Sequence, residues 1–201
     1  MIVIIDYNVG NLKSVTNAFQ RIGLETIVSR NHEIIAQADG IVLPGVGAFP
    51  VAMENLKKYD LIDILRERKE VGVPILGICL GMQILFEKGY EVKETKGLGF
   101  LKGEVKLMEV NEKIPHMGWN ELCFHQPHPL IKYLHEKDYV YFVHSYMAYP
   151  TDDELVAYCE YGDLKVTAMV AKGNVMGCQF HPEKSGEIGK KILLAFKELI
   201  E

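Results

Sequence analysis

The sequence predicts an α/β protein with a mostly parallel central sheet flanked by helices and with additional antiparallel strands. In the first half of the chain, short β-branched runs alternate with amphipathic segments, which is typical of strand–helix–strand units. Residues 97–108 and the stretch after residue 140 carry closely spaced strand-like segments instead, which indicates antiparallel strands. Because the 201 residues show no repeats or linkers, we expect one domain over residues 1–201.

The elements follow from these patterns. Runs of β-branched and apolar residues predict strands at residues 2–5, 25–28, 40–43, 75–78, 140–143, 155–161, 164–170 and 175–180. Apolar residues at helical spacing predict helices over residues 12–22, 49–71 and 80–89, and from Gly186 to the end of the chain. Gly23 is expected to end the first of these helices.

Charge and cysteine content exclude several classes of protein. The formal net charge of -5 offers no basic stripe for nucleic acid and no basic patch for a membrane surface. The apolar residues 1–5 end at Asp6 without a basic leader, so we expect neither a signal peptide nor a transit peptide. Four cysteines without a Cys-x-x-Cys pair argue against a zinc site and suit a reducing cytoplasm. The loop with His125 and His128 lacks a partner ligand, so neither a metal nor a cofactor is expected.

Cys79 stands between an apolar strand and the start of a helix. Gly77 and Gly81 lie two positions away on each side, which is the cysteine form of the nucleophile elbow. A helix N-terminus favours the thiolate, and the backbone N–H of Leu80 would help to bind an oxyanion there. The alternative is a small apolar cysteine packed between strand and helix.

His181 and Glu183 follow the last predicted strand. In an extended chain, residues two apart project to the same side, so the carboxylate can hold the imidazole in one orientation. The alternative is a polar pair on the surface. With Cys79 as the attacking group, His181 as the proton shuttle and Glu183 as the orienting acid, the three residues meet the requirements for acyl transfer.

The chemistry of two further segments does not by itself decide their roles. Gly45 and Gly47 follow a strand and allow backbone N–H groups to face a ligand, but they lack the rest of a nucleotide-binding motif. Trp119, the only tryptophan, stands beside Met117 in a turn-like segment. Such a pair is either a plug in the core or a surface that contacts a partner.

Residues 77–83 and 179–183 resemble the two halves of the active site of class I (triad-type) glutamine amidotransferases. Residues 6–12, 115–120 and 142–146 extend the resemblance over essentially the whole chain. The resemblance implies that glutamine is hydrolysed through a thioester on Cys79, which releases glutamate and ammonia without a cofactor. It also implies a heterodimer with a cyclase subunit, a (β/α)8 barrel, that uses the ammonia in histidine biosynthesis.

The resemblance also assigns roles to individual residues. Residues 44–47 match the family's oxyanion strand, whose peptide is thought to reorient so that the N–H of Val46 joins that of Leu80. The residues that match glutamine-binding positions are Gly47, Gln83, Ser145 and Tyr146, and those that match the surface facing the cyclase are Pro115, Met117 and Trp119. The chain departs from the family's usual residues at Asn8, Lys102 and Cys178. Neither asparagine, which tolerates positive φ, nor a small apolar cysteine threatens the mechanism.

Three other functions compete with this one. The chain could be the glutaminase of another synthase, such as those that make pyridoxal phosphate or anthranilate. It could be a regulatory subunit without catalysis, although such a subunit has no need of Cys79, His181 and Glu183 together. It could also be a cysteine peptidase of the same sheet type, although the matches at Gln83 and Ser145 favour a small amide substrate.

Overall fold

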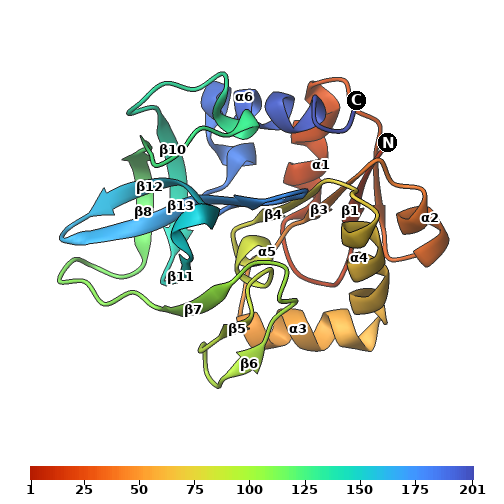
Figure 1. Ribbon diagram of the computed structural model, residues 1–201, viewed down its shortest axis with the longest axis horizontal. Helices are drawn as coiled ribbons and strands as arrows, with labels where there is room; N and C mark the ends of the chain where they lie inside the picture. The colour runs from red at the N-terminus through yellow and green to blue at the C-terminus, as the bar shows by residue number, and fades with distance from the viewer.

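The computed structural model describes residues 1–201 and has an eight-stranded sheet at its centre (Figure 1). Its strand order is β2-β1-β3-β4-β14-β13-β12-β9. The parallel part comprises β1 (Ile2–Ile5), β2 (Thr26–Ser29), β3 (Gly40–Leu43), β4 (Ile75–Ile78) and β14 (Val175–Cys178). The antiparallel part comprises β13 (Leu164–Lys172), β12 (Leu155–Tyr161) and β9 (Cys123–Phe124). The predicted fold class, mostly parallel with added antiparallel strands, is confirmed.

Helices cover both faces of the parallel strands (Figure 1). On one face lie α1 (Leu12–Arg21) and α6 (Gly186–Lys197), and Phe19 of α1 meets Phe196 of α6 edge to face. The other face packs against α2 (His32–Ala36), α3 (Phe49–Lys58) and α4 (Leu61–Glu70). Alternate residues of β1 enter the two cores, Ile2 and Ile4 on the first face and Val3 and Ile5 on the second, as the period of a strand requires.

Two small sheets stand beside the carboxyl ends of the parallel strands. One pairs β10 (Tyr139–His144) with β8 (His116–Glu121), antiparallel. The other has the order β11-β7-β5-β6 and comprises β11 (Tyr146–Pro150), β7 (Gly103–Leu107), β5 (Lys88–Gly89) and β6 (Thr95–Lys96). Ser145 is the single residue between β10 and β11, so the chain passes from one small sheet to the other at a position next to the central sheet.

Two predicted helices were wrong in extent. The helix expected over residues 49–71 is divided into α3 and α4, because Asp60 adopts a left-handed conformation with φ of 55°. The helix expected over residues 80–89 is only α5 (Leu80–Gln83). The N–H groups of Leu98 and Phe100 bond to the carbonyls of Ile84 and Leu85, so the next turn of helix is replaced by tertiary hydrogen bonds.

Other boundaries shifted less. The strand expected over residues 175–180 ends at Cys178, and of residues 97–108 only β7 is a strand. Asn8 has φ of 61°, which confirms that this asparagine accepts a left-handed conformation. No helix is both long and apolar enough to cross a membrane.

The histidine loop at residues 125–129 makes local contacts of its own. His125 Nε2 lies 2.9 Å from Asp152, and His128 Nδ1 accepts a hydrogen bond from the N–H of Leu130. No group of three or more His, Cys, Asp or Glu side chains is arranged to hold a metal ion.

Candidate active site

Cys79 lies in the turn between β4 and α5, where its backbone has φ of 55° and ψ of -111°. Positive φ is costly for a residue with a side chain and is concentrated at functional sites. The two flanking glycines are required by close packing. A Cβ on Gly81 would lie 1.8 Å from the carbonyl oxygen of Leu43, and one on Gly77 would lie 2.5 Å from that of Gly81. The spacing Gly-x-Cys-x-Gly therefore produces the strained elbow that the sequence predicted.

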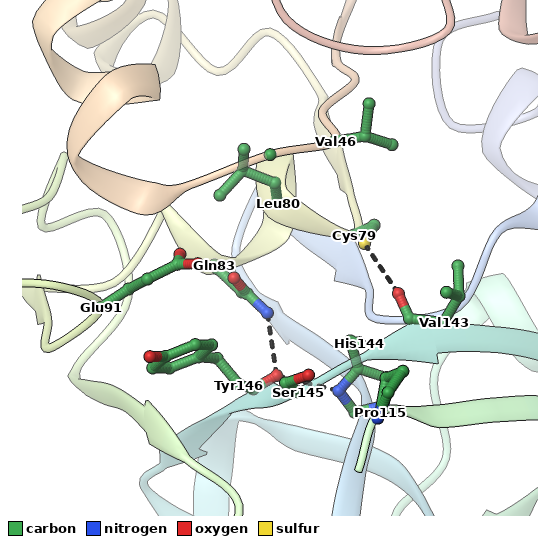
Figure 2. A pocket seen from close by; sticks show the side chains of 11 residues that line it. Val46, Cys79, Leu80, Gln83, Glu91, Pro115, Val143, His144, Ser145 and Tyr146 are labelled. Carbon is green, nitrogen blue, oxygen red and sulfur yellow. Dashed lines mark hydrogen bonds between the residues drawn. The ribbon is translucent and has the colours of Figure 1, made fainter.

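The sulfur of Cys79 faces a cavity of about 370 Å³ (Figure 2). The sulfur lies 4.0 Å from the carbonyl oxygen of Val143 and 3.7 Å from Nε2 of Gln179. The residues lining the cavity are Val46, Gly47, Cys79, Leu80, Gln83, Glu91, Pro115, Val143, His144, Ser145 and Tyr146. The glutamine-binding positions expected from the sequence thus lie around the same cavity as the candidate nucleophile.

His181 and Glu183 form a buried pair beside this turn. Nδ1 of His181 lies 2.8 Å from Oε1 of Glu183, and each side chain is only 2% exposed, so the alternative of a surface polar pair was wrong. Burial by itself lowers the pKa of His181, but the interactions with Cys79 and Glu183 outweigh it and raise the pKa to about 9. Nε2 of His181 makes no hydrogen bond within the protein. This nitrogen is therefore free to exchange a proton with the cysteine or with a substrate.

Glu183→Gln is expected to lower the pKa of His181, because it removes one of the two groups that raise it. It should reduce activity less than His181→Ala, since loss of orientation is less damaging than loss of the proton carrier. The raised pKa of His181 stabilises the folded protein. This contribution to the free energy of unfolding is complete below about pH 6.5, the ordinary pKa of histidine, and is lost as pH rises through about 9. The variant should therefore lose part of this added stability at neutral pH and below.

An NMR titration of the imidazole, together with thermal unfolding at several pH values, measures both effects. Glu187→Gln, an exposed acid in α6, serves as the matched control. An unchanged pKa in Glu183→Gln would contradict the assigned role.

The oxyanion donor expected at Leu80 is occupied. The N–H of Leu80 donates to the carbonyl oxygen of Gly45 at 3.3 Å, so residues 44–47 turn a carbonyl toward the elbow rather than an N–H. The segment is also held upstream, where the buried hydroxyl of Tyr7 donates to the carbonyl of Pro44. Val46 is exposed and Gly47 has φ of 118°, a conformation that favours glycine. The N–H of Val46 belongs to the same peptide as the Gly45 carbonyl and therefore points away from the elbow.

The side chain of Gln83 is held in one orientation. Its Nε2 donates both to the carbonyl oxygen of Tyr146 and to Oε1 of Gln179, each at 3.0 Å. Both amide hydrogens are thereby used, which leaves Oε1 of Gln83 as an acceptor in the cavity.

Sequence reasoning assigned no role in the site to Glu91, His144 or Gln179. Glu91 is the only acidic side chain in the cavity wall, and its Oε2 accepts a hydrogen bond of 2.8 Å from the N–H of Phe49. No motif surrounds Glu91, and it enters the site through the loop between β5 and β6. Gln179 stood inside the resemblance to the family, but its contact with the sulfur of Cys79 depends on the fold.

Pro115, Met117 and Trp119 lie on or next to β8, and all three are exposed. Met117 is 63% exposed and Trp119 is 55% exposed, with the Trp119 ring edge-on to Tyr141 at 6.0 Å. The alternative of a tryptophan plug in the core was therefore wrong. Pro115 also lines the cavity, so this surface and the cavity adjoin.

Known proteins resemble this chain in both fold and sequence. The family described as "Glutamine amidotransferase class-I" matches residues 3–199. Among solved structures, a glutamine amidotransferase has a TM-score of 0.78 at 20% identity and covers 100% of this chain and 99% of its own. PurLQS from Thermotoga maritima has a TM-score of 0.77 at 22% identity, with coverage of 100% and 98%. At these identities the structures demonstrate the fold alone. The chain belongs to the class I glutamine amidotransferase family.

Closer relatives narrow the comparison. The imidazole glycerol phosphate synthase subunit HisH of Lactococcus lactis subsp. lactis is 63% identical, over 99% of this chain and 98% of that protein. The HisH subunit of Bacillus cereus strain B4264 is 51% identical, over 100% of this chain and 96% of that protein. The HisH subunit of Aquifex aeolicus is 48% identical, over 99% of this chain and 97% of that protein.

Proposed function

We propose that this chain is the glutaminase subunit of imidazole glycerol phosphate synthase. It hydrolyses glutamine to glutamate and ammonia and passes the ammonia to the cyclase subunit HisF, a (β/α)8 barrel, within a heterodimer in the cytoplasm. The observation that carries the proposal is the cavity in which Cys79 meets Gln83, Ser145 and Tyr146, beside the buried pair of His181 and Glu183. Identity of 63% to HisH over nearly the whole chain supports the choice of synthase.

The chemistry is nucleophilic acyl transfer. The thiolate of Cys79 attacks the side-chain amide carbon of glutamine, and the carbonyl oxygen takes the negative charge. When the C–N bond breaks, His181 delivers a proton from Nε2 to the departing nitrogen, which leaves as ammonia. The glutamyl group remains on Cys79 as a thioester. His181 then accepts a proton from water as the water attacks the thioester, which releases glutamate and returns the proton to the Cys79–His181 pair. Glu183 holds the imidazole through Nδ1 in every step.

The cavity suits an amino acid. The carboxylate of Glu91 provides the negative charge that an α-ammonium group requires, and the free Oε1 of Gln83 accepts a hydrogen bond from the same ligand. Ser145, between β10 and β11, adds a short polar side chain to the cavity wall. These groups support a preference for free glutamine over glutamine within a peptide, whose α-nitrogen carries no charge.

The occupied N–H of Leu80 supports the proposal that the isolated subunit rests in a form with an incomplete oxyanion site. We infer that binding of the cyclase rotates the peptide between Gly45 and Val46. The N–H of Val46 would then join that of Leu80 at the oxyanion. Such gating prevents glutamine from being consumed when no acceptor for ammonia is present.

The cyclase is proposed to bind the exposed face at Pro115, Met117 and Trp119. Methionine and aromatic side chains are enriched at protein interfaces. Because Pro115 also borders the cavity, ammonia formed at Cys79 would emerge under this face rather than into open solvent. Exclusion of water matters, since free ammonia in bulk water is protonated and lost.

Trp119→Ala is expected to weaken binding of the cyclase about thirtyfold, because exposed tryptophans at interface centres commonly contribute about 2 kcal/mol or more. Folding should change little, since the side chain is more than half exposed. Isothermal titration with the cyclase measures the effect, with Val71→Ala, an exposed residue after α4, as the control. Equal affinity of the two variants would place the interface elsewhere.

Release of glutamate from glutamine by the purified chain, with and without a cyclase subunit, tests the function itself. Hydrolysis that responds to this cyclase supports the proposal. Hydrolysis that ignores it would favour the glutaminase of a different synthase, and no hydrolysis in either state would favour a regulatory subunit.

A further inference from the structure

A buried histidine pair connects β8 with the wall of the cavity. His116 of β8 and His144 of β10 are cross-strand partners, with Nδ1 of the first 3.0 Å from Nε2 of the second. Nδ1 of His144 lies 2.8 Å from the carbonyl oxygen of Tyr146. At the other end, Nδ2 of Asn120 lies 3.2 Å from Nε2 of His116. The chemistry assigned to Cys79, His181 and Glu183 does not use these groups.

The direction of each hydrogen bond follows from its neighbours. A carbonyl oxygen only accepts, so Nδ1 of His144 carries a hydrogen and its Nε2 accepts from Nδ1 of His116. Nε2 of His116 then accepts from the amide of Asn120. That amide cannot turn over without loss, because Oδ1 accepts from the N–H of Glu121 and Nδ2 also donates to the carbonyl of Glu160.

Both imidazoles are therefore neutral. Burial lowers the pKa of His116 to about 4 and that of His144 to about 3, so neither accepts a second proton at neutral pH. Each ring nitrogen has one partner, and the pair has a single arrangement of hydrogens.

The pair ends at the group that orients Gln83. The carbonyl oxygen of Tyr146 accepts from both His144 and Gln83, so the histidine helps to hold the acceptor to which Gln83 donates (Figure 2). Gln83 continues the network to Gln179, whose Nε2 approaches the sulfur of Cys79 at 3.7 Å. A set of hydrogen bonds thus runs from β8 to the candidate nucleophile.

We propose that His116 and His144 are positioning residues for glutamine binding, acting through the Tyr146 carbonyl to hold the Gln83 amide toward the cavity. The inference rests on the proposed function. His116 stacks on Phe142 at 4.7 Å and on Tyr161 at 4.3 Å between ring centroids. A phenylalanine would satisfy that packing, so what histidine adds is its two nitrogens.

The position of β8 gives this pair added significance. His116 and Asn120 carry the hydrogen bonds on the inner side of the strand, whereas Met117 and Trp119 are exposed to solvent. The same six-residue strand therefore presents the proposed cyclase surface and supports the glutamine pocket.

His116→Phe separates packing from hydrogen bonding, since it keeps an aromatic ring and removes both nitrogens. In the complex with the cyclase, we expect KM for glutamine to rise about tenfold while kcat falls less than about threefold. Tyr161→Phe is the matched control, because it retains the other ring of the stack and removes only the hydroxyl that donates to Lys113. Its KM should equal that of the wild type.

A rescue variant strengthens the test. In His116→Asn, Nδ2 takes the place of Nδ1 and can donate to His144, so KM should return toward the wild-type value. Should His116→Phe not fold, Asn120→Leu removes the donor at the other end and is expected to raise KM about threefold.

A merely structural role would lower the fraction of active protein, and so the apparent kcat, without moving KM. Unchanged KM in the folded His116→Phe variant, or in Asn120→Leu if the first does not fold, would overturn the inference. A wild-type complex that releases no glutamate would instead overturn the proposed function on which the inference rests.

Discussion

Replacement of Cys79 by serine is expected to lower the kcat of glutamine hydrolysis by at least about 10⁴-fold, since removal of a nucleophile from a catalytic triad has effects of this order. Cysteine is a nucleophile as its thiolate, and a thiol loses its proton far more readily than a hydroxyl does. A serine hydroxyl stays protonated in the same position. The two side chains differ little in size, so the elbow should fold unchanged.

Synthesis from added ammonium separates chemistry from folding in this experiment. A Cys79→Ser complex that makes product from ammonium but not from glutamine retains a sound interface and lacks only the nucleophile. Cys123→Ser, at a half-buried cysteine in β9, is the control and should keep both activities. Loss of both activities in Cys79→Ser would show that Cys79 is structural.

The cyclase is expected to stimulate glutamine hydrolysis by at least about 10²- to 10³-fold, since a single oxyanion donor contributes this much in comparable sites. In the isolated chain, the N–H of Leu80 already bonds to the carbonyl oxygen of Gly45, and the N–H of Val46, in the same peptide as that carbonyl, points away from the elbow. The proposed rotation of the peptide between Gly45 and Val46 would release the N–H of Leu80 and turn the N–H of Val46 toward the site. The gain should appear in kcat rather than KM, because these groups bind the charge that develops during reaction.

Glutamate release by the isolated chain and by the complex measures the stimulation directly. The amide NMR signals of Val46 and Gly47 should move when the cyclase and its nucleotide ligand bind, while those of α2 should not. High activity of the isolated chain that is unaffected by the cyclase would show that the observed arrangement of residues 44–47 does not limit the reaction.

The elements of the site that lie close together in the chain could be predicted from the sequence. The elbow could be predicted from Gly77, Cys79 and Gly81, because the close approach of Gly77 to the carbonyl of Gly81 lies within the turn itself. The approach of Gly81 to Leu43 of β3, by contrast, depends on the fold. The pairing of His181 with Glu183 was also predicted, although Pro182–Lys184 form a 3-10 helix and not the extended chain on which that prediction rested. The alternation of strands and helices was likewise readable, since burial of one face imposes its period on the sequence.

The tertiary structure alone decided the features that join distant segments. Glu91 enters the cavity, and Gln179 approaches the sulfur of Cys79, only because separate elements meet at the carboxyl ends of the parallel strands. The break at Asp60 and the exposure of Trp119 also depend on what each segment packs against.

The carbonyl of Gly45 at the N–H of Leu80 is the clearest example of this division. Glycines at positions 45 and 47 allow the backbone to adopt several conformations, and for that reason they do not specify one of them. The choice depends on contacts with Tyr7 and with the elbow, which lie far away in the chain. The sequence by itself thus determined the candidate reacting groups and much of their local geometry, whereas the fold decided which way the peptide between Gly45 and Val46 faces at the elbow.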